Sequence, residues 1–180
     1  RPAAKEEIKS LGATFVGVED EETAGQTGAY AREMSDAFRK KQAELMAATV
    51  AKNDMVICTA LVMGRRAPVI VTAEMAASMK PGSVIVDLAA DAGGNCEATV
   101  PGEAIEKNGV TILGHRNWPA RIPVAASALY AKNLLTFLET MIDKKEKKLA
   151  INWDDEIIKG TALTRDGAVI HPNFKPKTAA

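Results

Sequence analysis

Three short apolar runs constrain the fold of this chain more than any other feature. They cover residues 54–59, 83–88 and 110–113, and each is nearly continuous rather than alternating with polar residues. Such a run is typical of a strand that is buried on both faces of a parallel sheet. Residues 14–18 form a fourth, shorter apolar run. The sequence therefore predicts four strands of a parallel sheet.

Segments with helical patterns separate the predicted strands. They cover residues 2–11, 35–52, 72–79 and 124–142. Ser35 and Thr72 are suitable N-caps, and Gly12 is a suitable C-terminal stop. Strands that alternate with helices predict a doubly wound, parallel α/β sheet of the Rossmann-like type. After the long helix, residues 151–158 predict a strand, and residues 161–170 predict a C-terminal β-hairpin tail that turns at Asp166-Gly167.

Composition excludes several classes of function. Lys and Arg total 23 and Asp and Glu total 23, so the net charge is zero, which argues against a nucleic-acid partner. No apolar run approaches the roughly 20 residues of a membrane-spanning helix, so we expect no membrane insertion by this chain. Two cysteines and two histidines are too few for a disulfide framework, and the spacing predicts no metal site.

Ligands of doubly wound sheets lie outside the carboxyl ends of the strands, which directs attention to four loops. The loop after residue 18 leads to Tyr30, which is either part of a lid or an anchor for a solvent loop. The loop after Cys58 begins with the small residues Thr59 and Ala60, and Gly64 allows a turn, so a ligand can approach the backbone there. An ordinary strand exit explains this loop equally well.

Two aspartates and one asparagine follow the later strands. Asp87 ends a buried strand, where an unpaired carboxylate is costly, so we expect it to have hydrogen-bond partners. Asp91 stands beside Gly93-Gly94 and is either a general acid/base or, more commonly, a turn-capping residue. Asn117 lies in a polar segment after the last strand and can offer its amide to a ligand, whereas His115 fits a partly buried histidine better. Together the loops predict a ligand site of unspecified chemistry.

In order, these segments resemble the NAD(H)-binding component of the proton-translocating nicotinamide nucleotide transhydrogenases. The stretches that carry the resemblance are residues 1–12, 28–34, 59–61, 67–68, 81–89, 93–97, 117–121, 126–130 and 164–167. Alanine dehydrogenases are a related family of the same fold, but the Gly-Gly-Asn-Cys form at 93–96 and the Asp-Gly tail are more similar to transhydrogenases. Met63 and Arg66 depart from the usual transhydrogenase pattern, which affects the expected contacts of their loop.

The resemblance implies a cofactor and partners. In that family the component binds NAD(H) and passes a hydride directly to NADP(H) on a separate domain, while a membrane domain couples the exchange to proton movement. It further implies a homodimer at the cytoplasmic face of the bacterial inner membrane or in the mitochondrial matrix. Direct transfer between two nicotinamides requires orientation and exclusion of water but no side-chain acid or base. We therefore assign no catalytic residue.

The resemblance also implies which residues bind NAD(H). Residues 28–34 belong to a mobile loop that closes on the nucleotide, residues 59–61 lie against it, and Arg1 follows the ribose-binding acidic position. The segment around Asn117 lines the nicotinamide end. The expected cofactor-binding residues are Arg1, Gly28, Ala29, Tyr30, Met34, Thr59, Ala60, Leu61, Asp87 and Asn117.

No G-x-G-x-x-G fingerprint occurs in the sequence, so the phosphate loop of a dinucleotide site is missing. We expect residues 1–121 to be the C-terminal part of a Rossmann-like NAD-binding domain, and residues 122–180 to be the long helix and hairpin tail of the adjoining domain. By this interpretation the chain is a fragment whose strands do not form one continuous sheet and which binds NAD weakly alone. An alanine dehydrogenase fragment, in which Asp91 matters, and a non-catalytic interaction module are the alternatives.

Overall fold

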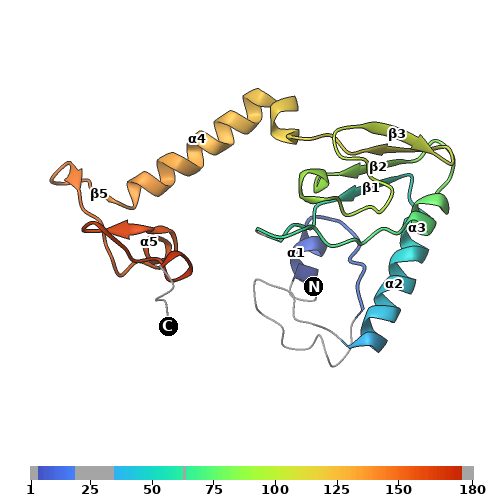
Figure 1. Cartoon of the computed structure of the whole chain (residues 1–180), viewed down its shortest axis with the longest axis horizontal. Helices are drawn as coiled ribbons and strands as arrows, with labels where there is room; N and C mark the ends of the chain where they lie inside the picture. The colour runs from blue at the N-terminus through green and yellow to red at the C-terminus, as the bar shows by residue number, and fades with distance from the viewer. Residues whose placement is uncertain (1–3, 19–34, 63, 176–180) are drawn as a thin grey trace. The chain divides into compact units, whose positions relative to one another are not determined.

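The computed structural model describes residues 4–18, 35–62 and 64–175. The chain divides into two compact units, Arg1–Trp118 and Pro119–Ala180 (Figure 1). Each unit is considered by itself. None of the described helices is long and apolar enough to cross a membrane.

The first unit is built on one mixed sheet. Its strands are β1 (Met55–Cys58), β2 (Val84–Asp87), β3 (Ala104–Lys107) and β4 (Val110–Leu113), in the order β1-β2-β4-β3. Strand β1 pairs parallel with β2 and β2 pairs parallel with β4, whereas β3 is antiparallel to β4. The three long apolar runs therefore form the parallel part of the sheet, which confirms the predicted α/β fold class.

Two expectations about the strands were wrong. Residues 14–18 form no strand, and Val16 is half exposed there, so a short apolar run without a neighbouring strand is not enough. The strands that do form make one continuous sheet rather than separate pieces. Strand β3 was not predicted because it lies at the edge of the sheet and three of its four residues are exposed, which leaves no apolar pattern to detect.

The helices of the first unit begin where their capping residues predict. They are α1 (Lys5–Ser10), α2 (Asp36–Val50), α3 (Ala73–Ala77) and the short 3₁₀ helix η2 (Ala90–Ala92). The Ser35 hydroxyl accepts the N–H of Phe38 at 3.2 Å, and the Thr72 hydroxyl accepts the N–H of Met75 at 3.1 Å. Each bond satisfies an N–H that the first turn of a helix leaves free. Gly12 has φ +79°, as a residue that ends a helix requires.

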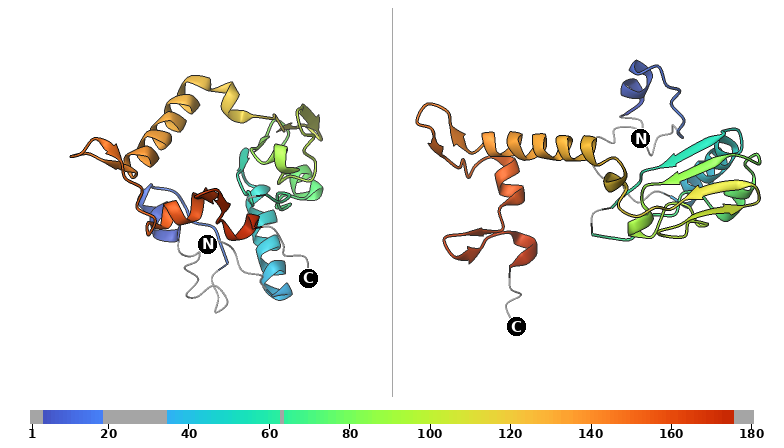
Figure 2. Two further views of the ribbon diagram at one scale, coloured as in Figure 1. Left: turned by 60° about the vertical axis from the view of Figure 1, so that its left-hand side comes forward. Right: turned by 90° about the horizontal axis from the view of Figure 1, so that it is seen from above.

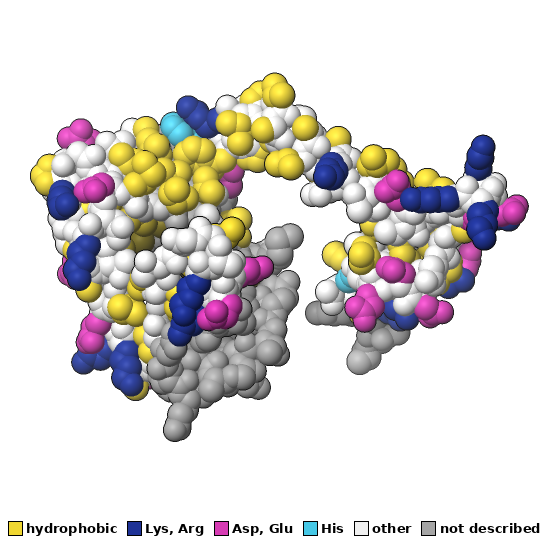
Figure 3. Space-filling model, turned by 180° about the vertical axis from the view of Figure 1, so that it is seen from behind, with side chains coloured by type: hydrophobic (Ala, Val, Ile, Leu, Met, Phe, Trp, Pro, Cys, Tyr) yellow, Lys and Arg dark blue, Asp and Glu magenta, His cyan; other side chains and the backbone are white. Residues whose placement is uncertain are grey.

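The two faces of the sheet differ. Helices α2 and α3 lie against one face (Figure 1 and Figure 2). The core on that side consists of Val50, Cys58, Val71, Ala76, Met79, Ile85, Cys96, Val110 and Ile112. On the other face, Met55 and Ile57 of β1 are each 59% exposed, and Figure 3 shows hydrophobic side chains on the surface of this unit. Since strands of parallel sheets are normally covered on both faces, the open face is one that further polypeptide would cover.

The second unit begins with a long helix. Helix α4 (Pro123–Glu139) has Pro123 at its first turn and follows the short 3₁₀ helix η3 (Trp118–Arg121). The predicted long helix is confirmed, but it ends three residues before the predicted end at 142. Ile142 instead begins a small hairpin of β5 (Ile142–Asp143) and β6 (Lys148–Leu149), which the sequence did not indicate.

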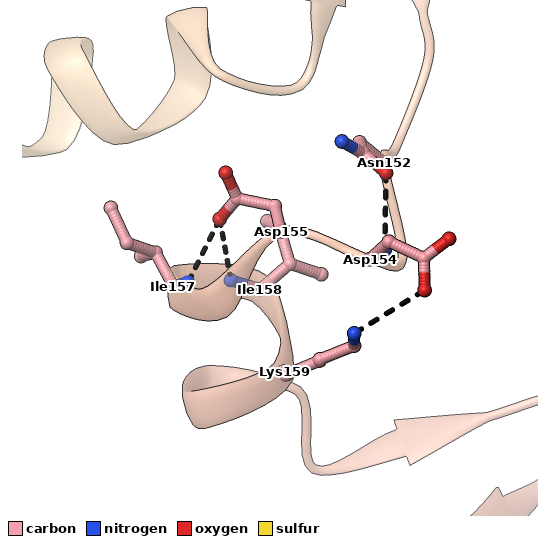
Figure 4. A network of polar contacts seen from close by, with 6 residues as sticks. All are labelled: Asn152, Asp154, Asp155, Ile157, Ile158 and Lys159. Carbon is pink, nitrogen blue, oxygen red and sulfur yellow. Dashed lines mark hydrogen bonds and ion pairs between the residues drawn. The ribbon is translucent and has the colours of Figure 1, made fainter.

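The predicted strand at 151–158 is wrong, because its second half starts helix α5 (Glu156–Thr161). The Asp155 carboxylate accepts the N–H groups of Ile157 and Ile158 at 2.8 and 3.1 Å (Figure 4). This N-cap outweighs the β-propensity of the two isoleucines. The predicted hairpin is confirmed as β7 (Thr164–Arg165) and β8 (Ala168–Val169), with Asp166 at φ +50° and Gly167 at φ +79°, as a two-residue type I′ turn requires. The 3₁₀ helix η4 (Pro172–Phe174) follows it.

Candidate functional site

The carboxyl ends of β1, β2 and β4 meet at one edge of the sheet, because these three strands are parallel. This is the edge at which doubly wound sheets bind their ligands. Three loops leave it, at residues 59–68, 88–99 and 114–118. Hydrogen bonds from a few buried polar side chains determine how these loops lie.

Asp87, the last residue of β2, is fully buried. One carboxylate oxygen accepts the N–H of Ala89 at 3.0 Å. The other accepts the N–H groups of Asn95 and Cys96 at 2.8 and 3.0 Å, and the hydroxyl of Thr99 at 2.7 Å. The expected hydrogen-bond partners are therefore present, and all of them belong to the loop that follows β2. Asp87 shapes this loop, while its predicted contact with a cofactor stays a prediction.

Gly94 allows the loop to close around the Asp87 carboxylate. Its φ is +83°, and a Cβ atom built on it would lie 2.9 Å from the Asp87 Oδ2 and 3.2 Å from the Cβ of Thr99. Any larger residue would collide with the carboxylate as well as adopt an unfavourable backbone conformation. The Gly-Gly pair is thus explained by close approach of the loop to Asp87.

Asn95 connects the loops after β1 and β2. Its side chain is fully buried. Its Oδ1 accepts the N–H of Ala60 at 3.0 Å, and its Nδ2 donates to the carbonyl oxygens of Ala60 and Pro68 at 2.9 and 2.8 Å. Sequence reasoning did not select Asn95, although it quoted the Gly-Gly-Asn-Cys stretch. The available signal was an amide side chain in an otherwise small and apolar segment directly after a strand.

Asp91 and Asn117 join the loops after β2 and β4. The Asp91 Oδ2 accepts the backbone N–H of Asn117 at 2.8 Å, and Asn117 has φ +48°. The indole N–H of Trp118 donates to the Asp87 carbonyl oxygen at 3.1 Å, and the ring of His115 packs edge-on against Trp118 at 5.3 Å. Asp91 therefore holds a neighbouring loop, and His115 is a packing residue as expected. The Asn117 side chain is exposed at the edge.

An open hollow of about 540 Å³ lies between the loops after β1 and β2. Its lining combines apolar, basic and acidic side chains with one glycine. These residues are Leu61, Val62, Gly64, Arg65, Arg66, Asp91 and Ala92. The aliphatic stem of Arg66 lies over Gly93, since a Cβ built on Gly93 would be 3.0 Å from the Arg66 Cγ.

The structure brings some of the predicted cofactor-binding residues together at this edge. Thr59 and Leu61 are exposed, and Ala60 between them is partly buried and bonded to Asn95. Asp87 and Asn117 end or follow the neighbouring strands. The remaining predicted residues lie outside the described ranges; they are Arg1, Gly28, Ala29, Tyr30 and Met34.

Neither cysteine has the properties of a nucleophile. Burial, followed by the negative charge of Asp87 and by Cys96, raises the pKa of Cys58 to about 12. Burial also raises the pKa of Cys96. Both thiols are therefore protonated at neutral pH and belong to the core. Within residues 4–18, 35–62 and 64–175, no group of three or more His, Cys, Asp or Glu side chains could hold a metal ion.

Comparison with known proteins identifies the family. The family model described as "Alanine dehydrogenase/PNT, C-terminal domain" matches residues 1–172, and the chain belongs to this family. Over 174 residues it is 51% identical to the first of the polypeptides that make up the NAD(P) transhydrogenase alpha subunit of Rhodospirillum rubrum, a match that covers 96% of this chain and 45% of that protein. The chain thus spans less than half of this relative's length.

A solved structure and a more distant relative agree with this assignment. The crystal structure of transhydrogenase from Sinorhizobium meliloti superimposes with a TM-score of 0.72 at 52% identity, over 94% of this chain and 43% of that one. Alanine dehydrogenase 1 of Staphylococcus aureus is 34% identical over 109 residues, which is 58% of this chain and 29% of that protein. The resemblance to transhydrogenases is therefore confirmed, and alanine dehydrogenases are more distant relatives.

Proposed function

We propose that this chain forms part of the NAD(H)-binding component of a transhydrogenase, an enzyme that transfers a hydride between NADH and NADP⁺. The observation that carries the proposal is the extent of the similarity. A transhydrogenase subunit is 51% identical over 96% of the chain, whereas an alanine dehydrogenase is 34% identical over 58% of it.

The carboxyl edge of the sheet suits the binding of a dinucleotide. Small and exposed residues at 59–61 leave room for a ligand beside the backbone, and the exposed amide of Asn117 is held nearby by the Asp91 carboxylate. The hollow next to them has an apolar wall at Leu61 and Val62, which fits a flat ring. NAD(H), when bound, supplies or accepts the hydride. The residues of this chain orient it and exclude water, and no side chain needs to donate or remove a proton.

The remaining cofactor contacts are proposed from the family resemblance. They are Arg1 and the loop residues Gly28, Ala29, Tyr30 and Met34. In this proposal the loop closes on the nucleotide after binding, as lids over active sites do, and Tyr30 is its aromatic contact. The proposed contacts among the described residues are Thr59, Ala60, Leu61, Asp87 and Asn117.

The partners follow from the same proposal. NADP(H) binds to a separate domain, and a membrane domain couples hydride transfer to proton translocation, at the cytoplasmic face of a bacterial inner membrane or in a mitochondrial matrix. Helix α4 supports further association, because it has no buried residue and its Val124, Leu129 and Tyr130 are 85%, 66% and 67% exposed. An apolar helix of this kind requires a covering surface. We propose a homodimer as the assembled form.

The alanine dehydrogenase alternative depends on Asp91. In that case Asp91 would have to be free for proton transfer, whereas its carboxylate accepts the N–H of Asn117 at 2.8 Å. Alanine-dependent reduction of NAD⁺ by the whole protein would favour this alternative. Its absence, together with hydride exchange between NADH and an NADP⁺ analogue, would favour the transhydrogenase.

Titration with NADH, followed by its fluorescence, tests the proposed function. The chain is measured alone and after mixing with the segment of the Rhodospirillum rubrum relative that it does not match, supplied as a second polypeptide. We expect weak binding alone and clear binding by the mixture, because the glycine-rich phosphate loop is absent from this sequence. Failure of the mixture to bind NADH would contradict the proposal and favour a non-catalytic module.

A further inference from the structure

The loop at residues 60–68 lines most of the hollow at the carboxyl edge, and its two ends are fixed differently. Its returning end is fixed by backbone bonds, since Ala67 N–H donates to Ala92 O at 2.8 Å, and Ile70 and Val71 donate to Asn95 O at 2.8 and 3.0 Å. Its outgoing end follows β1 directly. In the described part of the chain, the Asn95 side chain is the hydrogen-bond partner of both backbone groups of Ala60.

The Asn95 amide imitates a neighbouring strand. Its Oδ1 and one Nδ2 hydrogen bond the N–H and the C=O of Ala60, which is the reciprocal pair that two antiparallel residues exchange. The second Nδ2 hydrogen bonds the Pro68 carbonyl oxygen at the other end of the loop. One side chain therefore closes the neck of the loop. Asn95 is itself fixed, because its own N–H donates to Asp87 Oδ2 at 2.8 Å.

Every hydrogen-bonding group of the Asn95 side chain is used, and the residue is fully buried. Apolar residues of similar volume leave the Ala60 and Pro68 groups unpaired, and aspartate presents a carboxylate oxygen to two carbonyl oxygens. A glutamine is too long for a fully enclosed position. The arrangement is thus specific for asparagine, which a residue that only fills the core would not require.

We propose that Asn95 is a positioning residue for nucleotide binding, one that holds the backbone of residues 59–61 in its binding conformation without touching the nucleotide. The proposal rests on the proposed function, since it assumes that NAD(H) binds beside these residues. Loss of the clamp makes the bound conformation one of several, and the ligand then has to order the loop on binding.

Two measurements on Asn95→Leu test the proposal. Hydrogen exchange should show lost protection at the Ala60 amide with unchanged protection in β4. Calorimetric titration with NAD⁺, with the complementing polypeptide present, should show a dissociation constant raised about tenfold, the factor that corresponds to roughly 1.4 kcal/mol. Val110→Ala is the matched control, because Val110 is fully buried at the amino end of β4. It destabilises the same unit and should change the dissociation constant less than about twofold, because it leaves the clamp intact.

Asn95→Asp provides a readout that a purely structural role would not give. Its protonated carboxyl group can accept from the Ala60 N–H and donate to one carbonyl oxygen, while the ionised form cannot donate. We therefore expect its NAD⁺ affinity to recover as the pH is lowered from about 8 to about 6, in contrast to Asn95→Leu and the unmodified chain.

The outcomes separate the two proposals. Equal effects of Asn95→Leu and Val110→Ala on affinity, while the unmodified mixture binds NAD⁺, would overturn the role of Asn95 and leave the proposed function intact. A pH-independent affinity of Asn95→Asp would overturn it as well. Absence of NAD⁺ binding by the unmodified mixture would overturn both, even if the loss of Ala60 protection demonstrated the clamp.

Discussion

The carboxyl edge of the sheet and helix α4 are built in opposite ways. At the edge, buried polar groups are paired within the chain: Asp87 accepts four hydrogen bonds and Asn95 makes three through its side chain. Helix α4 has no buried residue at all, although Leu129, Leu135 and Tyr130 on it are apolar. The edge is therefore determined by contacts inside the chain, whereas α4 depends on a surface that other polypeptide supplies.

This difference predicts where substitutions will matter. Changes at the sheet edge should disturb the folded chain itself, because the lost partners are internal. Changes on α4 should leave the chain folded and alter only its association.

The largest effect is expected for Asp87→Ala. It leaves three N–H groups and a hydroxyl of the β2 loop without their acceptor, and each unpaired buried group costs about 1–3 kcal/mol. The free energy of unfolding, measured in urea, should therefore fall by at least about 3 kcal/mol. Asp54→Ala is the matched control, since Asp54 is 82% exposed and pairs with Lys80 at 3.4 Å. A loss of about 0.5 kcal/mol or less is expected there. Similar losses for both variants would refute the internal role of Asp87.

Gly94→Ala should have the next largest effect. The new Cβ would lie 2.9 Å from the Asp87 carboxylate, so the loop must shift, and we expect destabilisation of about 2 kcal/mol or more. Gly167→Ala is the control, because its φ of +79° is comparable and no atom lies within 4 Å of the added Cβ. Thermal unfolding of the two variants separates the collision from the backbone strain. Equal melting temperatures would show that close approach to Asp87 is unimportant.

Asp155→Ala should cost about 1 kcal/mol, the usual effect of losing an N-cap. The lost bonds are those to Ile157 and Ile158 at the start of α5. Asp154→Ala removes the neighbouring carboxylate, which pairs with Lys159 while its side chain is 95% exposed, so it serves as a control with little effect. Circular dichroism during urea unfolding provides the measurement. An unchanged stability of Asp155→Ala would mean that tertiary contacts alone hold α5.

Substitutions on α4 should have a small effect on stability. Leu129→Gln and Leu135→Gln alter side chains that are 66% and 59% exposed, so the free energy of unfolding of the chain should change by about 0.5 kcal/mol or less. Sedimentation should instead show weaker self-association, if the proposed homodimer covers this helix. A large loss of stability at low protein concentration, where the chain is monomeric, would contradict the comparison.

The smallest effect at neutral pH concerns Cys58, whose pKa is raised from 9.0 to about 12, first by burial and then by Asp87. Well below pH 9.0 the thiol is protonated in both the folded and the unfolded chain, so it contributes no pH dependence. Between pH 9.0 and about 12 only the unfolded chain releases the proton, and the free energy of unfolding falls as the pH rises. Cys58→Ala should remove this share of the decline. Parallel pH profiles for the two proteins would contradict the assignment.

The parallel part of the fold was predictable because its signal is local. The apolar runs that became β1, β2 and β4 contain their own evidence of burial, and Ser35, Thr72 and Asp166-Gly167 indicate caps and a turn through side chains that act on adjacent backbone. Strand β3 and the segment at 14–18 were misjudged for the opposite reason. Whether they form strands depends on neighbours that are distant in sequence.

The candidate site was predictable as a place but not as a network. Parallel strand order predicts that residues 59–61, Asp87 and Asn117 approach one edge. That Asn95 would bond Ala60, 35 positions away, depends on how two loops fold back on each other. No spacing rule contains this information. Asp91 was left between proton transfer and turn formation, and its bond to the Asn117 N–H became visible only in three dimensions.

The central claim is that NAD(H) binds at the carboxyl edge of the first unit. Hydrogen exchange with and without NAD⁺, in the presence of the complementing polypeptide, tests it most directly. The account predicts slower exchange at residues 59–61 and around Asn117 when NAD⁺ is added, with no change at the β7–β8 hairpin. Protection that is confined to other regions of the chain, or absent although NAD⁺ binds, would contradict the account.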